Sequence, residues 1–300
     1  MYTRIAFLAC ICAAAGCAAD TGWTAQPFTP AHSFTSGVEG PACDRDGNLY
    51  AVSYQRESTI GKVTPQGQAS LFVEMPDAGR ANGLRLDSHG NLIVADYFRH
   101  RVYLLDTKTG KFLENLTRDW KGPEFYQPND VAIAADDTIY FSDPDWKDRG
   151  GAIYMIAAPP HRRTVLLEKG LTTPNGITVS PDEKHVYVGQ SEAHNILVYD
   201  RNPDGTLRNK RVLARLPEGG VPDGIRCDVK GNLWVAIFGL GRILLVHPDG
   251  KLDDRYIQLH GKSPTNLTFC GKGGGGRTLY ITETEQGRIE KFTAPDPGIR

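Results

Sequence analysis

The sequence predicts an all-β protein folded as a six-bladed β-propeller, with four antiparallel strands in each blade. The first observation is a polar turn followed by a pair of apolar residues, which recurs six times at intervals of 43, 47, 47, 47 and 46 residues. The pairs are Leu49-Tyr50, Leu92-Ile93, Ile139-Tyr140, Val186-Tyr187, Leu233-Trp234 and Leu279-Tyr280. Short β-forming runs at a fixed period of this length are typical of propeller blades.

The second observation is that each period contains the parts of a four-stranded blade. The turns read RDGN, SHGN, ADDT, PDEK, VKGN and, last, a glycine-rich stretch. A third β-forming run follows each pair, such as RVYLLD, and a fourth follows in five periods, such as SLFVEM. The sixth period lacks its fourth run. We therefore expect residues 31–37 (AHSFTSG) to pair with the last blade, close the ring and remove the open edges.

The N-terminal segment has the composition of a secretory signal. One cation, Arg4, precedes an apolar run from Ile5 to Ala15 that is too short to span a bilayer. The following A-A-G-C resembles a bacterial lipobox, which would make Cys17 the lipidated first residue of the mature protein; ordinary cleavage with release is the alternative. We expect residues 1–16 to be a signal peptide, 17–30 a tether and 31–300 the propeller of an exported bacterial protein, periplasmic or membrane-anchored.

Charge and cysteine content narrow the classes of partner. A net charge of −1 without a basic run argues against nucleic acid binding. After the signal segment the cysteines are Cys43, Cys227 and Cys270, so at most one disulfide can form among them. All three share one register on the predicted innermost strands, and we expect three small buried apolar residues. We expect a monomer whose only membrane contact is a lipid at Cys17.

One polar position per blade stands about ten residues before each apolar pair, with an insertion in the last period. The residues are Glu39, Asn82, Asn129, Asn175, Asp223 and Asn266. Each carries a carbonyl or carboxylate oxygen, and the first strand of a blade lines the central channel, so the six should form a ring at one end of the axis. Such a ring suits Ca²⁺, which takes about six to eight oxygen ligands. Glu39 and Asp223 would neutralise its charge.

Turn chemistry is the competing explanation for these positions, because Asn-Gly and Asp-Gly are common in tight turns. It accounts for Asn82-Gly83, Asn175-Gly176 and Asp223-Gly224. It does not account for Glu39, since glutamate is not a turn former. We therefore expect three or four of the six residues to contact an ion, and the others to contact substrate or water.

Five of the six ring residues stand in five motifs that follow one another over nearly the whole mature chain. They are VEGPACDRDGNLYAV, ANGLRLDSHGNLIVAD, QPNDVAIAADDTIYFSDP, PNGITVSPDEKHVYVG and DGIRCDVKGNLWVA. In these motifs the chain resembles the SMP-30/gluconolactonase family of regucalcin-like lactonases. The resemblance implies a six-bladed propeller with one catalytic divalent cation, usually Ca²⁺, on its axis. It also implies Glu39, Asn175 and Asp223 as metal ligands, Asn129 as a ligand or substrate contact, and Asp223 as proton acceptor.

One departure from the family pattern concerns the substrate. Regucalcin-like members that act on sugar lactones read R-x-N-D where this chain has Gln127-Pro128-Asn129-Asp130. The missing arginine leaves the sugar-lactone specificity open. The sequence IYFSDP is closer to the broader lactonase branch of the family.

Strand direction predicts which residues share the propeller face that carries the ring residues. Second strands end at this face, and the loops that lead into first strands lie on it. The expected substrate contacts are Asn129, Asn82, Gln127, Asp130, Arg80, Tyr97 and Trp146. The insertion 118–127 is a candidate lid.

A metal-bound carboxylate has a depressed pKa and is a weak base. Asp143, Asp130 or a metal-bound water therefore compete with Asp223 as the activator of water. Asp143 and Asp96 also end strands, where an aspartate often bonds turn amides.

These observations favour a Ca²⁺-dependent hydrolase that opens a small lactone or related ester, the cation polarising the substrate carbonyl. Mg²⁺, Mn²⁺ or Zn²⁺ are candidate substitutes. The first alternative is a non-catalytic, Ca²⁺-stabilised propeller that binds a ligand or a protein. The second is a metal-free, strictosidine-synthase-like propeller, which Glu39 and Asp223 on one axis argue against.

Overall fold

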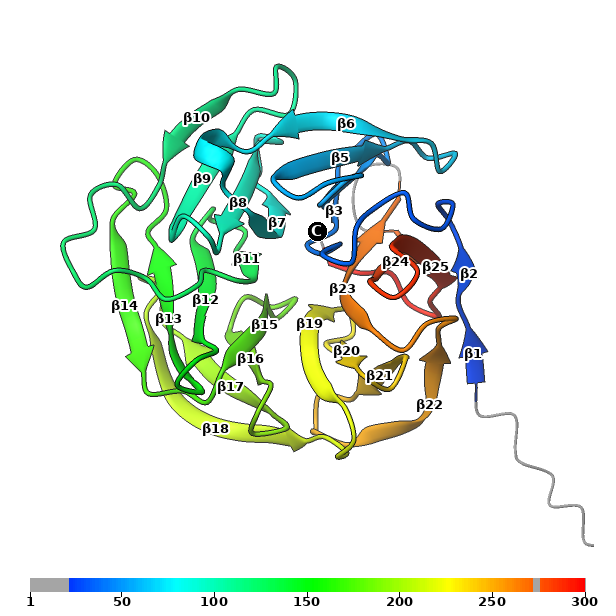
Figure 1. Cartoon of the computed structure of the whole chain (residues 1–300). Coiled ribbons are helices and arrows are strands. Elements are labelled where there is room, and N and C mark those ends of the chain that lie inside the picture. The colour runs from blue at the N-terminus through cyan, green and yellow to red at the C-terminus, as the bar shows by residue number, and fades with distance from the viewer. Residues whose placement is uncertain (1–21, 272–275, 300) are drawn as a thin grey trace, which may run out of the picture.

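Six β-sheets stand around a common axis in the computed structural model, which describes residues 22–271 and 276–299 (Figure 1). Blade one contains β3 (Ala42–Cys43), β4 (Leu49–Val52), β5 (Thr59–Val63) and β6 (Ala69–Glu74); blade two contains β7 (Ala81–Leu86), β8 (Leu92–Asp96), β9 (Arg101–Leu105) and β10 (Phe112–Asn115). Blade three contains β11 (Val131–Ile133), β12 (Ile139–Asp145), β13 (Gly150–Ile156) and β14 (Thr164–Lys169); blade four contains β15 (Pro174–Val179), β16 (His185–Gln190), β17 (Asn195–Arg201) and β18 (Leu207–Arg215). The predicted six-bladed propeller is confirmed.

The last two blades each take a strand from the N-terminal segment. Blade five contains β19 (Val221–Cys227), β20 (Leu233–Phe238), β21 (Arg242–Val246) and β22 (Leu252–Gln258), flanked by β1 (Gly22–Thr24); blade six contains β23 (Pro264–Cys270), β24 (Thr278–Glu283) and β25 (Arg288–Thr293), completed by β2 (Gln26–Pro27). One short 3₁₀ turn, η1 (Pro76–Ala78), precedes blade two. Within the described residues, no helix is long and apolar enough to cross a membrane.

The core lies between the blades. One cluster combines Ile93 and Val102 of blade two with Phe141 and Tyr154 of blade three, and the other interfaces are built in the same way. Because the second strand of a blade is covered on both faces, it reads as a continuous apolar run, as in β20. This explains why the apolar pairs were visible in the sequence.

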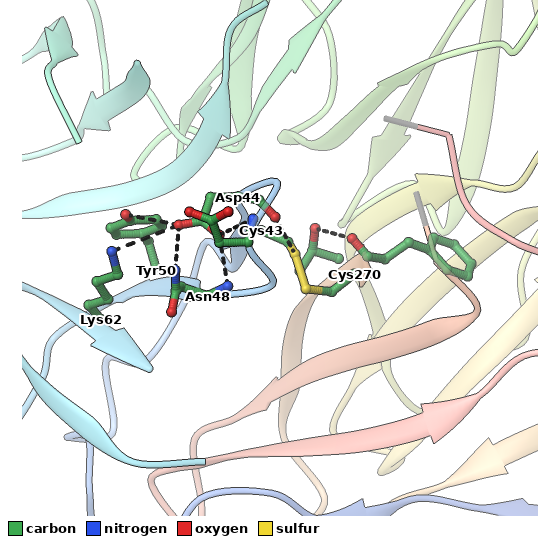
Figure 2. The surroundings of a disulfide bond; sticks show 9 residues. Cys43, Asp44, Asn48, Tyr50, Lys62 and Cys270 are labelled. Carbon is green, nitrogen blue, oxygen red and sulfur yellow. Dashed lines mark hydrogen bonds and ion pairs between the residues drawn. A yellow bond between two sulfur atoms is a disulfide. The ribbon is translucent and has the colours of Figure 1, made fainter. Parts of the chain in front are cut away.

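The repeated turn has a specific hydrogen-bonding function. The Asp44 carboxylate accepts the backbone amide of Asn48 (2.8 Å) and its side-chain amide (2.9 Å), as Figure 2 shows. Asp87 and Asp228 accept the same two donors in blades two and five. The motif D-x-x-G-N therefore closes the first hairpin of a blade, and it lies at the end of the propeller opposite the ring.

The strand that closes the ring lies earlier in the chain than expected. Gln26 pairs with Lys291 of β25, and Gly22 pairs in parallel with Tyr256 of β22. Residues 31–37 instead cross from blade six to blade one, where Phe34 forms an isolated bridge with Tyr54. The prediction for 31–37 was wrong because this segment must run inward to the ring position at residue 39, while the open edge lies on the outside.

The start of the propeller also differs from the expected boundary. Residues 22–27 form strands of blades five and six, so this part of the expected tether belongs to the propeller. The signal segment and Cys17 lie outside the described residues.

A disulfide joins the innermost strands across the closure. Cys43 of blade one and Cys270 of blade six are bonded, with Cα atoms 5.5 Å apart and 227 residues between them in sequence (Figure 2). The expectation of three buried thiols was wrong for this pair, because equal register on neighbouring inner strands places the two side chains next to each other. Cys227 is buried and not disulfide-bonded.

We expect Cys43→Ser to lower the free energy of unfolding by about 2 to 5 kcal/mol, because the bond closes a very long loop. Denaturant unfolding of the oxidised protein measures the loss, and Cys227→Ala serves as the matched control. Equal midpoints for Cys43→Ser and the oxidised parent protein would contradict a stabilising closure.

Candidate active site

The ring residues meet at the mouth of the channel, where the innermost strands begin. Asn82, Asn175, Asp223 and Asn266 lie on β7, β15, β19 and β23, while Glu39 and Asn129 stand just before β3 and β11. Asn266 Nδ2 donates to Glu39 Oε1 at 2.6 Å, which links blades six and one across the closure. The structure therefore brings residues far apart in sequence to one end of the axis.

A glycine follows the ring residue in four blades, and each one packs against the next blade. A Cβ on Gly176 would stand 2.2 Å from the Asp223 carbonyl oxygen, and one on Gly224 would stand 2.3 Å from the Asn266 side chain. Gly40 and Gly83 meet the next ring residue in the same way. These glycines are required by the close approach of neighbouring strands, an explanation distinct from turn chemistry.

Three ring oxygens are buried without a hydrogen-bond partner among the described residues: Glu39 Oε2, Asn129 Oδ1 and Asn175 Oδ1. For Asn175 the amide end is fixed, because its Nδ2 donates to Ser191 Oγ (3.2 Å), which in turn donates to the Pro222 carbonyl (2.8 Å). Leaving a buried acceptor unsatisfied costs about 1 to 3 kcal/mol. Three such oxygens at one place are a set that a hard cation would satisfy.

The carboxylates at the mouth are electrostatically crowded. Burial, followed by the charge of nearby Asp130, raises the pKa of Glu39 to about 7. Burial and then the charge of Glu39 raise the pKa of Asp223 well above its usual value. Among residues 22–271 and 276–299, no three His, Cys, Asp or Glu side chains cluster as a metal site, so a cation here would depend on the amide oxygens as well.

Asn266 orients its neighbours in the ring. Its Nδ2 faces both Glu39 Oε1 and Asp130 Oδ1 (3.3 Å), and its Oδ1 accepts the amide of Leu267 (2.9 Å). The amide must point this way, since an oxygen turned toward two carboxylates would be repelled. Asn266 therefore supports Glu39 and offers no oxygen to an ion.

Asp130 lies below the ring and is fully buried. Arg226 holds it with two parallel bonds, Nη1 to Oδ2 at 2.9 Å and Nη2 to Oδ1 at 3.0 Å. The amide of Ile177 also donates to Oδ2. These contacts favour a structural role for Asp130, where the sequence suggested a substrate contact or a base. Sequence reasoning missed Arg226, although an arginine between apolar residues on an inner strand was a usable signal.

Asp143 anchors the loop that enters blade three. Its oxygens accept the backbone amides of Tyr126 (3.0 Å) and Gln127 (2.7 Å), and burial raises its pKa to about 7. Asp96, Gln190 and Glu283 end the second strands of their own blades and bond the entering loops in the same way. This repetition favours a positioning role for Asp143 over the catalytic role suggested by its sequence position.

The insertion 118–127 is held in place by aromatic packing. Trp120 stacks on Phe125 (5.7 Å) and meets Tyr154 edge-on (5.5 Å). Asp143 binds the backbone amides at the end of this segment. The segment predicted as a lid is therefore held at two places, by the packing of Trp120 and by Asp143.

The remaining predicted contacts lie on the same face. Asn82, Gln127 and Tyr97 are half-buried and Trp146 is exposed. Arg80 forms an ion pair with Glu57 at 2.7 Å. Two surface hollows, of about 330 Å³ beside β25 and about 270 Å³ between blades three and four, are lined by none of the ring residues.

The fold and this mouth define a six-bladed propeller with an oxygen-lined axial site. Residues 37–285 match the family described as SMP-30/Gluconolactonase/LRE-like region, and the chain belongs to this family.

Curated relatives agree with this assignment. The gluconolactonase of Zymomonas mobilis is 28% identical over 286 residues, covering 85% of this chain and 79% of its own. The 6-deoxy-6-sulfogluconolactonase of Pseudomonas putida is 30% identical over 242 residues, covering 79% and 80%. A structure of regucalcin from Agrobacterium tumefaciens, described as calcium-binding, shares the fold with a TM-score of 0.75 at 20% identity, covering 93% and 97%. Family and relatives support a lactonase-type hydrolase.

We expect Arg226→Met to destabilise the protein by about 3 to 5 kcal/mol, because the buried Asp130 carboxylate would lose both guanidinium hydrogen bonds and keep only the more distant charge of Arg85. Adding Asp130→Asn should restore a large part of the loss, and Arg208→Met, on the exposed strand β18, is the control. Chemical unfolding of the parent protein and of these three variants measures their free energies of unfolding. A double variant as unstable as Arg226→Met would show that the ion pair is not the cause.

We expect Asp143→Asn to cost about 1 to 3 kcal/mol, since the new amide group would face a backbone N–H in place of an acceptor. Hydrogen exchange should rise in residues 117–127. Asp119→Asn, exposed in the same loop, is the control. Lost turnover with unchanged exchange in this loop would instead identify Asp143 as a catalytic residue.

Proposed function

We propose that this protein is a Ca²⁺-dependent hydrolase that opens a small lactone or related ester at the mouth of the propeller axis. The observation that carries the proposal is the group of three buried oxygens, on Glu39, Asn129 and Asn175, without partners among the described residues. Asp223 stands beside them with part of its surface accessible.

Glu39, Asn175 and Asp223 would hold the cation, with Asn129 as a fourth ligand or as a contact to the substrate. When bound, the cation would polarise the substrate carbonyl and stabilise the oxyanion. The hard, all-oxygen donor set fits Ca²⁺, with Mg²⁺ or Mn²⁺ as substitutes, and fits Zn²⁺ less well because it lacks His and Cys.

The contacts of the other carboxylates make Asp223 the proposed proton acceptor. Both oxygens of Asp130 are bonded to Arg226, and both oxygens of Asp143 are bonded to backbone amides. Asp223 is the ring carboxylate that keeps an accessible surface, so one of its Oδ atoms can take the proton of an attacking water. Ser191 accepts a hydrogen bond from Asn175 and donates one to the carbonyl of Pro222, the residue before Asp223.

The family assignment supports the reaction class, since the relatives bear the names of lactonases. We further propose that the chain is exported, with lipidation at Cys17 as its anchor. The disulfide across the closure is consistent with export.

We expect Glu39→Gln and Asp223→Asn to weaken Ca²⁺ binding at least about tenfold, because each removes one ligand charge. Titration calorimetry on the mature chain measures this, with Asp249→Asn, exposed at the opposite end, as control. Hydrolysis of a panel of γ- and δ-lactones should vanish with a chelator and return with Ca²⁺. Ca²⁺ binding without turnover of any lactone or ester would favour the non-catalytic propeller.

A further inference from the structure

The exposed aromatic side chains of the described residues gather at one end of the propeller. Phe98, Tyr126, Trp146 and Phe238 are 46%, 47%, 41% and 40% exposed, and we call them the aromatic rim. The large exposed aliphatic side chains lie on the outermost strands β6, β10, β14, β18 and β22 or at the opposite end. Exposed apolar side chains that gather at one place usually mark a binding surface.

Strand register places the rim at the same end of the propeller as the ring residues. Phe238 pairs with Val221, two residues before Asp223. Phe98 follows Asp96, which pairs with Ala81 beside Asn82. Phe238 ends β20 of blade five and Phe98 follows β8 of blade two, and these two strands lie on different sides of the axis (Figure 1).

The other two rim residues come from blade three. Tyr126 precedes Asn129 by three residues and is held by Asp143 through its backbone amide. Trp146 follows β12, the strand that carries Asp143. The rim therefore stands over three blades.

Two charged groups beside Phe98, Arg80 and Asp96, are engaged with partners inside the protein. Arg80 pairs with Glu57 and lies over the Phe98 ring at 5.1 Å, which fixes Phe98 as a platform. Asp96 Oδ1 accepts the amides of Arg80 and Arg99. A substrate rich in hydroxyls needs donors and acceptors aimed at it. Beside these engaged groups, the four aromatic side chains of the rim are exposed and free to contact a ligand.

We propose that the substrate is a γ- or δ-lactone that carries an apolar substituent, either an alkyl chain or an aromatic group. The substituent packs on the aromatic rim while the lactone carbonyl reaches the polar ring residues at the axis. This inference rests on the proposed hydrolase function and names its substrate class. It differs from the sugar lactones in the names of the relatives.

The test is a series of δ-lactones with alkyl substituents from methyl to hexyl, with glucono-δ-lactone for comparison, hydrolysed by the mature protein with Ca²⁺. We expect kcat/KM to rise by about two- to fourfold for each added methylene that is buried, and glucono-δ-lactone to be the poorer substrate. Phe98→Ala and Phe238→Ala should flatten this dependence. Leu113→Ala, 53% exposed on the outer strand β10, should leave it unchanged.

Calorimetric binding of the matching alkyl δ-lactams, which resist hydrolysis, separates this inference from the hydrolase proposal. Affinity that rises with chain length and is lost in Phe238→Ala supports the rim, even where no lactone is hydrolysed. Metal-dependent hydrolysis of glucono-δ-lactone without any chain-length effect, and with rim variants equal to Leu113→Ala, overturns the apolar substrate and leaves the hydrolase standing.

Discussion

The structure depends on one steric constraint, the close approach of the innermost strands at the axis. Gly176 and Gly224 touch the backbone or side chain of the next ring residue at distances that a Cβ would not allow. This approach is what brings oxygens from separate blades within reach of one point. Blade three departs from this pattern, because Asp130 stands where four other blades have glycine. Its buried carboxylate pairs with Arg226 of blade five. The same constraint therefore shapes both the mouth and the layer beneath it.

A ring of this kind holds its geometry only when the last blade is joined to the first. Three features act at this junction: β2 pairs with β25, Cys43 is bonded to Cys270, and Asn266 donates to Glu39. Two of them lie on innermost strands, so the closure and the ring share the same residues. Loosening the junction would displace Glu39 directly, because it stands only four residues before Cys43. Stability and function are thus coupled at the seam between blades one and six.

The fold could be predicted from the sequence because its signals are local: a turn with Asp44 or Asp228, then a buried apolar pair, repeated at a constant period. The ring positions followed from the same register. The closing strand could not be predicted, since Gln26–Pro27 is too short to show any alternation. The roles of Asp130 and Asp143 also depended on partners distant in sequence or on backbone amides, which no pattern of side chains reveals.

The polar side chains of this site fall into two classes, those whose oxygens all have hydrogen-bond partners and those with a buried oxygen that lacks one. Asp130 and Asp143 have satisfied oxygens, and each is used to build the protein. Glu39 and Asn175 keep one buried oxygen without a partner among the described residues, a cost that folding alone does not explain. A cation would satisfy the oxygens at the axis that lack a partner. The apolar part of a substrate would cover the exposed aromatic surface around them. A small ester with an apolar group would pack on the aromatic surface while its carbonyl reaches the cation.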